Sequence, residues 1–253
     1  MLGAFQPEEE IAFGLGKQIT LHGNAETMNL SSLVFQNALE SHYWRNELGK
    51  VDDLNQILQH IEKYVKHLDA WEKSSRSQSS ERMHGGVRGV SRGGLISSAF
   101  CILVKIHQLH ITMSDLYELA KFKRNVYVQC IALIYARHVL QPTELFKFFR
   151  HFIMCDDVVT VSNDGRRKMS VREIVRELLL EERWFDQILP RISRKLKDEL
   201  EEQIRDVIKD SKSSNKSLKE SGNKHRRNGS ADNKRRHRSR SRSRSPRRHK
   251  KHY

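Results

Sequence analysis

The twelve residues His84 to Leu95, HGGVRGVSRGGL, have the composition of a loop that could hold a phosphate group. Glycine-rich loops offer backbone amides to phosphates, but a P-loop also needs a Lys and then a Ser or Thr after its second glycine. Gly89 and Gly94 have the glycine spacing, yet Leu95 and Ile96 follow, so the cation and the magnesium ligand are both missing. The stretch also lacks the G-x-G-x-x-G spacing of dinucleotide-binding turns. The remaining possibility for phosphate binding is an anion held by the amino-terminal end of the helix that follows the stretch.

A structural or partner-binding role fits the same stretch better. Glycines allow positive φ angles and close backbone approach, and a planar guanidinium can bond carboxylates or helix carbonyls. We therefore predict a tightly packed or partner-binding loop that holds no cofactor, with contact to RNA as an alternative. The candidate site comprises this loop and the tryptophan before it: Trp71, Gly85, Gly86, Arg88, Gly89, Arg92, Gly93 and Gly94.

No other cluster of residues indicates catalysis or metal binding. His107 and His110 share one helix face near Cys101, but two or three such ligands without an acidic neighbour do not make a metal site. The sequence has no G-x-S-x-G, H-E-x-x-H or kinase motif. The three tryptophans, at 44, 71 and 184, are interpreted as core residues, with an RNA-stacking platform as the rival. We predict that the chain is not an enzyme and has no catalytic, cofactor-binding or metal residues.

The net charge of +15 belongs almost entirely to the end of the chain. From residue 210 onward there are 17 Lys and Arg against 3 Asp and Glu, a net charge of +14. The first 209 residues carry 29 basic and 28 acidic side chains, so the body is nearly neutral. A folded nucleic-acid-binding surface would make the body basic, which argues against one here.

The basic tail contains a strict Arg-Ser alternation from Arg238 to Ser245. Its cations would attract RNA, with a strong dependence on salt. Phosphorylation of the candidate sites Ser239, Ser241, Ser243 and Ser245 would add about −6 to −8 charges, which outweighs the four interleaved arginines. The run is thus a candidate charge switch, and the basic residues 234–238 before it favour import into the nucleus.

Hydrophobic periodicity predicts a mainly α fold. We expect helices near 29–39, 51–68, 95–106, 114–120, 125–139, 142–152, 170–179 and 196–207. A small β-hairpin near 158–169 interrupts them, and Ser170 with Glu173 matches a capping box. The predicted organisation is a loose extension over 1–26, one helical domain over 27–209 and a disordered Arg/Ser-rich tail over 210–253. No apolar run reaches the roughly 18 residues that span a bilayer, and no secretory signal is predicted.

Three stretches of the sequence resemble the pre-mRNA-splicing factor 38 family. They are LDAWEKSSR at 68–76, HGGVRGVSRGGLISSAFCIL at 84–103 and ERWFDQILPRI at 182–192, and they resemble the B-type paralogue more closely. The resemblance runs from about residue 29 to residue 208. It implies a mostly helical domain without known catalytic activity, which acts as a scaffold around activation of the spliceosome.

The expected function is therefore that of a nuclear, non-catalytic scaffold in pre-mRNA splicing. The resemblance implies partners among other spliceosomal proteins and small nuclear ribonucleoprotein particles, with RNA contact through the Arg/Ser tail and no membrane contact. The alternative is an SR-like regulator that binds RNA through this tail. A weaker third hypothesis is an enzyme that binds a phosphate ligand at the glycine-rich stretch.

Overall fold

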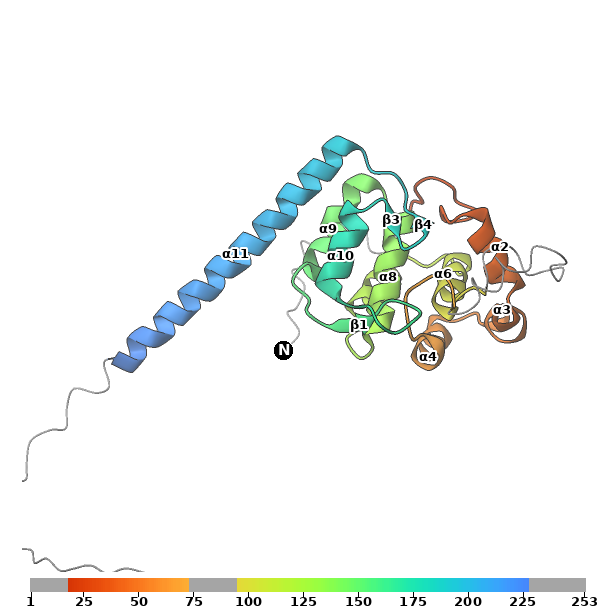
Figure 1. Ribbon diagram of the computed structural model, residues 1–253, viewed down its shortest axis with the longest axis horizontal. Helices are drawn as coiled ribbons and strands as arrows, with labels where there is room; N and C mark the ends of the chain where they lie inside the picture. The colour runs from red at the N-terminus through yellow and green to blue at the C-terminus, as the bar shows by residue number, and fades with distance from the viewer. Residues whose placement is uncertain (1–17, 73–94, 228–253) are drawn as a thin grey trace, which may run out of the picture. The chain divides into compact units, whose positions relative to one another are not determined.

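The computed structural model describes the backbone of residues 18–72 and 95–227, with side chains through residue 211 (Figure 1). It divides into two units, residues 1–209 and 210–253. The first unit is mainly helical, as predicted. Its helices, 3₁₀ turns (η) and strands are α2 (Ser32–Glu40), α3 (His42–Asn46), η1 (Leu48–Lys50), α4 (Leu54–Tyr64), α6 (Ser98–Gln108), α7 (Met113–Lys121), α8 (Val126–Val139), η2 (Pro142–Glu144), α9 (Leu145–Phe149), η3 (Arg150–Phe152), β1 (Val158–Thr160), β2 (Lys168–Ser170), α10 (Val171–Leu180), β3 (Arg183–Trp184), β4 (Gln187–Ile188) and α11 (Arg194–Arg227).

Helix α8 forms the centre of the core. All its residues from Val128 to Val139 are buried, because apolar side chains cover its whole circumference. It packs against α6 and α4 on one side and against α9 and α10 on another, and α7 lies beside it (Figure 1). Helix α6 is buried from Ala99 to His107. Both helices match the predicted segments closely, since two segments this apolar must lie inside the domain.

Side-chain caps fix where several helices begin. Asn125 accepts a hydrogen bond from the Tyr127 amide at 2.9 Å and so starts α8. Ser170 and Glu173 form the predicted capping box at the start of α10, with the Glu173 carboxylate 2.7 Å from the Ser170 amide. These backbone hydrogen bonds lower the pKa of Glu173. Each cap satisfies amides that would otherwise lack a partner, typically worth about 1 kcal/mol.

Two small antiparallel hairpins flank α10. The predicted one pairs β1 with β2, in the register Val159 opposite Met169, and its turn contains Gly165 at φ 75°. The second pairs β3 with β4, Trp184 opposite Gln187, and was not predicted from the sequence. Its turn places Phe185 at φ 50°, a conformation that bulky residues rarely adopt and that hairpin predictions assign to Gly or Asn.

The amino-terminal boundary and the first cap differ from the prediction. Residues from Gln18 onward belong to the domain: Gln18 bridges to Thr112, and the His22 amide donates to the Val139 carbonyl at 2.9 Å. The expected loose extension therefore does not cover 18–26. The cap of α2 is Ser31, so this helix begins later than the predicted start near residue 29, and Asn29 makes long-range contacts instead.

The carboxyl-terminal region differs from the prediction in its secondary structure. Within the first unit, α11 places Leu200 and Ile204 in the core, as its amphipathic pattern predicts. Its backbone continues through Asp210 to Arg227, so helix enters the region predicted to be disordered. Extending a formed helix costs far less free energy than nucleating a new one. The prediction of disorder rested on composition, which does not show that a helix precedes the tail. The Arg/Ser run at 238–245 lies outside the described residues.

Candidate protein-binding surface

The two ends of the glycine-rich stretch are held together by backbone pairing. Trp71 and Ile96 form an antiparallel bridge, flanked by hydrogen bonds from the Glu72 amide to the Leu95 carbonyl and from the Ser97 amide to the Ala70 carbonyl. Chain segments separated by the stretch thus enter and leave it side by side. The predicted site residues Gly85, Gly86, Arg88, Gly89, Arg92, Gly93 and Gly94 lie outside the described residues, and only Trp71 and the flanks are placed.

Trp71 is buried, as predicted for a core tryptophan, and its backbone is fixed on both sides. Its amide donates to the Asp69 carboxylate at 3.3 Å, and its carbonyl accepts from the Asn163 side chain at 2.9 Å. Asn163 belongs to the loop of the β1–β2 hairpin, so this hairpin supports the base of the glycine-rich stretch. Burial raises the pKa of Asp69, an effect that its two backbone hydrogen bonds oppose.

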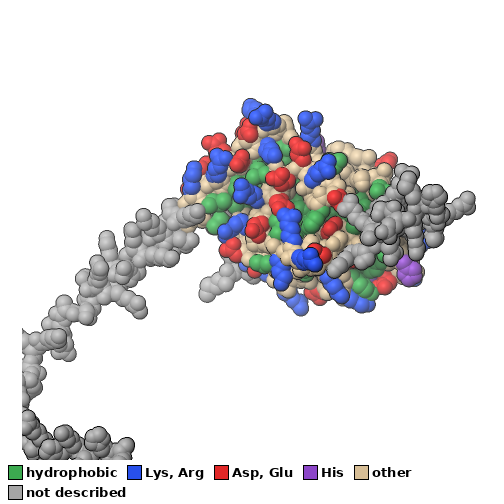
Figure 2. Space-filling view, in the orientation of Figure 1, with side chains coloured by type: hydrophobic (Ala, Val, Ile, Leu, Met, Phe, Trp, Pro, Cys, Tyr) green, Lys and Arg blue, Asp and Glu red, His purple; other side chains and the backbone are tan. Residues whose placement is uncertain are grey.

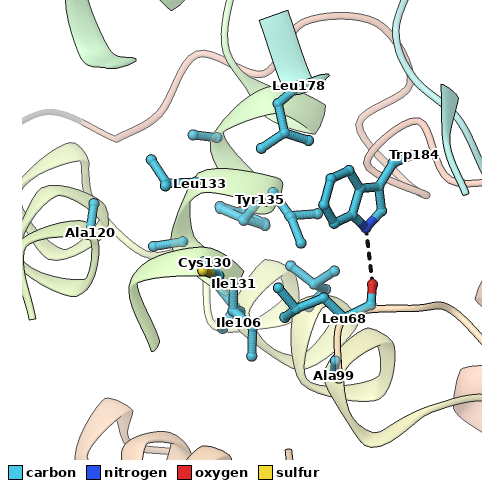
Figure 3. Packing of buried hydrophobic residues seen from close by; sticks show 14 of the residues in the cluster. Leu68, Ala99, Ile106, Ala120, Cys130, Ile131, Leu133, Tyr135, Leu178 and Trp184 are labelled. Atoms are coloured by element: carbon cyan, nitrogen blue, oxygen red, sulfur yellow. Dashed lines mark hydrogen bonds between the residues drawn. The ribbon is translucent and has the colours of Figure 1, made fainter. Parts of the chain in front are cut away.

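A second tie joins the β3–β4 hairpin to the same segment. The fully buried Trp184 indole donates to the Leu68 carbonyl at 2.9 Å (Figure 3). The Leu68 amide in turn donates to the Val161 carbonyl at 3.0 Å. Leu68 therefore connects both hairpins to the strand-like segment that ends in Trp71, and the ERWFDQILPRI stretch acquires a fixed position beside it.

A groove of about 650 Å³ opens between these elements and the segment before α2. Its lining residues are Asn24, Thr27, Asn29, Leu30, Ser31, Leu33, Trp71, Asp186, Gln187, Ile188, Leu189 and Pro190. Two apolar side chains on its edges are exposed, Ile188 at 68% and Leu33 at 39%. A groove lined by apolar and neutral polar side chains, with exposed aliphatic edges and Asp186 as its charged lining residue, is typical of a surface that binds another protein.

Asn29 fixes the amino-terminal wall of the groove. Its side-chain amide donates to the carbonyls of His22 at 2.6 Å and His138 at 2.7 Å, and its oxygen accepts from the Asn24 amide at 2.8 Å. Asn29 has φ 61°, which asparagine tolerates. Gly23 is required beside it, because a Cβ there would lie 2.2 Å from the Asn29 oxygen and its φ is 81°.

Below this wall lies a buried histidine without hydrogen-bond partners. His138 is fully buried in α8, and neither ring nitrogen has a partner among the described residues. Burial lowers its pKa to about 3, and the positive charge of Arg137 contributes. His138 therefore stays neutral in the folded domain at pH values where a solvated histidine is protonated.

The domain is expected to lose stability below pH 6.5 because of His138. The folded-state pKa lies below the unfolded value, so acid favours the unfolded chain by about 1.4 kcal/mol per pH unit below that value. Urea unfolding at pH 7.5 and 5.5 measures this, with His138→Leu as the comparison. Burial also lowers the pKa of His107. Because His107 is present in both proteins, its contribution to the pH dependence cancels in the comparison. Equal pH dependence in the two proteins would contradict the prediction.

No group of three or more His, Cys, Asp and Glu side chains in the part of the chain that the structure describes could hold a metal ion. His107 contacts the Ala25 carbonyl at 2.7 Å and the Tyr135 hydroxyl at 3.4 Å, which accounts for its position without a ligand. None of the described helices has the length and apolarity that a membrane span requires.

Most residues of the groove were not predicted as site residues. Trp71 was, but Asn29 was placed only at the start of the predicted helix near 29–39, and Ile188 only in the ERWFDQILPRI stretch. In the structure Ile188 is exposed beside buried Leu189, a difference that the sequence pattern does not show. The contact between Asn29 and His138 spans 109 positions and has no local signal.

Comparison with known proteins places this architecture in a family. Residues 19–202 match the PRP38 family. Pre-mRNA-splicing factor 38B of Homo sapiens is 33% identical over 178 residues, which cover 70% of this chain and 33% of that protein. Pre-mRNA splicing factor SR-like 1 of Arabidopsis thaliana is 26% identical over 175 residues, covering 69% of this chain and 40% of that protein. The chain thus spans well under half the length of these relatives.

A solved structure shows the same fold. The crystal structure of the Snu23-Prp38-MFAP1(217-258) complex of Chaetomium thermophilum matches with a TM-score of 0.56 and 19% identity, over 74% of this chain and 87% of the matched one. The family match covers most of the described first unit, including Trp71, both hairpins and the groove. The chain therefore belongs to the PRP38 family of pre-mRNA-splicing proteins.

Proposed function

We propose that this protein is a non-catalytic scaffold of the spliceosome that acts in the nucleus through protein–protein contacts. The groove between Trp71, the β3–β4 hairpin and the 24–33 segment carries the proposal, because it combines a rigid frame with exposed aliphatic edges. Family membership and the solved complex of a similar fold with other proteins support it. The near-neutral body agrees as well, since Figure 2 shows Lys and Arg mixed with Asp and Glu over the visible face.

We extend the proposal to the segments outside the described residues. The glycine-rich stretch, whose ends Trp71 and Ile96 hold together, would form part of the same docking surface. The Arg/Ser run would add salt-dependent contact with RNA or with other Arg/Ser-rich proteins, regulated by phosphorylation of Ser239, Ser241, Ser243 and Ser245.

Replacing Ile188 by Glu is expected to weaken docking without unfolding the domain. The side chain is exposed, so the free protein tolerates the charge, whereas an interface would have to desolvate it. Recovery of small nuclear ribonucleoprotein proteins from nuclear extract, titrated with tagged protein, should require at least about tenfold more of the variant.

The matched control is Val158→Glu, which places the same charge on a similarly exposed apolar residue of β1. It should bind like wild type. Nuclease treatment of the extract separates the two functions: partners that persist support the scaffold, and complete loss of partners supports the SR-like alternative through the tail. Equal recovery with both Glu variants would refute the groove as the docking surface.

A further inference from the structure

Arg137 is a buried cation without an acidic partner. The residue is 2% exposed and lies in the last turn of the core helix α8. Nε donates to the Leu178 carbonyl at 2.6 Å and Nη2 donates to the Pro190 carbonyl at 2.7 Å. Among the described residues no carboxylate lies within ion-pair distance of it. Buried arginines are normally paired with an acid, so this arrangement calls for an explanation.

The two carbonyls occupy only part of the guanidinium. Arg137 lies in the last turn of α8 and Leu178 in the last turn of α10, so the negative ends of both helix dipoles, at most about half a charge each, favour the cation there. A guanidinium has five N–H donors, and the two hydrogen bonds leave three of them on the Nη1 and Nη2 edge. Burial lowers the pKa of Arg137 only to about 10, so it stays charged at neutral pH. The free edge is therefore a charged, bidentate donor.

Arg137 lines a cavity of about 270 Å³ beneath the β3–β4 hairpin, adjacent to the groove but distinct from it. The two share only residues 188–190. The lining combines apolar side chains with four rim charges: Leu179, Leu180, Glu181, Glu182, Ile188, Leu189, Pro190, Arg191, Ile192 and Lys197. None of the rim charges is in an ion pair with another described residue.

We propose that this cavity binds a glutamate or aspartate side chain of a partner protein, flanked by an aliphatic residue. Arg137, Arg191 and Lys197 against Glu181 and Glu182 leave a net charge of +1, which matches one carboxylate. A phosphate, with nearly two negative charges, would face both glutamates at the rim. The apolar lining would pack against the neighbouring aliphatic side chain, and the Nη1 and Nη2 edge of Arg137 would donate to both carboxylate oxygens.

This inference rests on the proposed scaffold role only in taking the acidic side chain to come from a partner protein. The test needs no extract: acetyl-Ile-Glu-Leu-amide is titrated into the full-length protein labelled with ¹⁵N-arginine, and the Nε–H signal of Arg137 is followed. The matched peptides contain Gln or phosphoserine in place of Glu. We expect the Glu peptide to shift the Arg137 signal and to bind at least about tenfold more tightly than the Gln peptide, because hydrogen bonds to a charged group are the stronger ones.

Replacing the buried Arg137 could unfold the domain, so the charged residues at the rim of the cavity are substituted instead. Arg191→Gln should weaken binding of the Glu peptide by about two- to fivefold, and Glu182→Gln should strengthen it by a similar factor. Equal binding of the Glu and Gln peptides, tighter binding of the phosphoserine peptide, or no opposite effect of the rim variants would overturn the inference. Ile188 lines both the groove and this cavity, so Leu33→Glu, at an exposed residue that lines only the groove, repeats the extract experiment. Loss of nuclear partners with Leu33→Glu is independent of the peptide result, so the two proposals fail separately.

Discussion

Asn29→Asp is expected to destabilise the domain by about 3 kcal/mol or more. The amide of Asn29 donates to two backbone carbonyls, of His22 and His138, and a carboxylate can donate to neither. Both carbonyls would lose their partner, at about 1–3 kcal/mol each, and would also repel the new charge. The backbone conformation at φ 61° suits Asp as well as Asn, so the change isolates the lost donors.

Asn24→Asp is a matched control in the same loop. Within the part of the chain that the structure describes, the Asn24 side chain acts only as an acceptor, from the amides of Glu26 at 2.9 Å and Thr27 at 3.2 Å. A carboxylate accepts them equally well, so its effect should stay within about 0.5 kcal/mol. Urea unfolding at pH 7 followed by circular dichroism compares the two variants with wild type.

The pH dependence gives the Asn29 prediction a second readout. Two facing carbonyls raise the pKa of a carboxyl at position 29, and the protonated carboxyl regains one donor. The loss of unfolding free energy in Asn29→Asp relative to wild type should therefore shrink as the pH falls from 7 to 4. A deficit that is equal for Asn24→Asp and Asn29→Asp would show that the donors do not matter.

The sequence predicts those parts of the fold whose signals are local. Helix α8 is apolar around its circumference, Ser170 and Glu173 stand three apart, and Gly165 marks the turn between β1 and β2. Each signal depends on residues within a few positions of the element. These elements keep nearly the predicted boundaries when they pack against neighbouring segments.

Features that depend on contacts between distant segments could not be predicted. The β3–β4 turn lacks Gly or Asn although Phe185 has a positive φ, and Trp184 beside it is hydrogen-bonded to Leu68, 116 positions away. Arg137 and His138 lie within a helix whose pattern predicts burial, but the pattern does not show which polar groups lack partners. For the same reason the sequence indicated Trp71 but not the groove that Asn29 and Ile188 complete.

Trp184→Ala is expected to cost about 3–5 kcal/mol, a large part of the stability of a typical domain. The indole is fully buried against α10 and the core, so its removal leaves a cavity, and the Leu68 carbonyl loses its donor (Figure 3). Trp184→Phe retains most of the packing and removes the hydrogen bond, at about 1–3 kcal/mol. Thermal and urea unfolding followed by circular dichroism at 222 nm measure both.

Trp44→Phe is the control for a partly buried tryptophan that packs against the core and has the Lys105 amine 5.6 Å from its ring centroid. It should cost less than about 1 kcal/mol, because its ring is only partly buried. If Trp184 positions the β3–β4 hairpin, Trp184→Phe should also weaken partner binding under conditions where the variant is folded, whereas Trp44→Phe should not. Equal losses of stability for the two Phe variants would mean that the bond to Leu68 does not hold the hairpin, and the groove would then need another support.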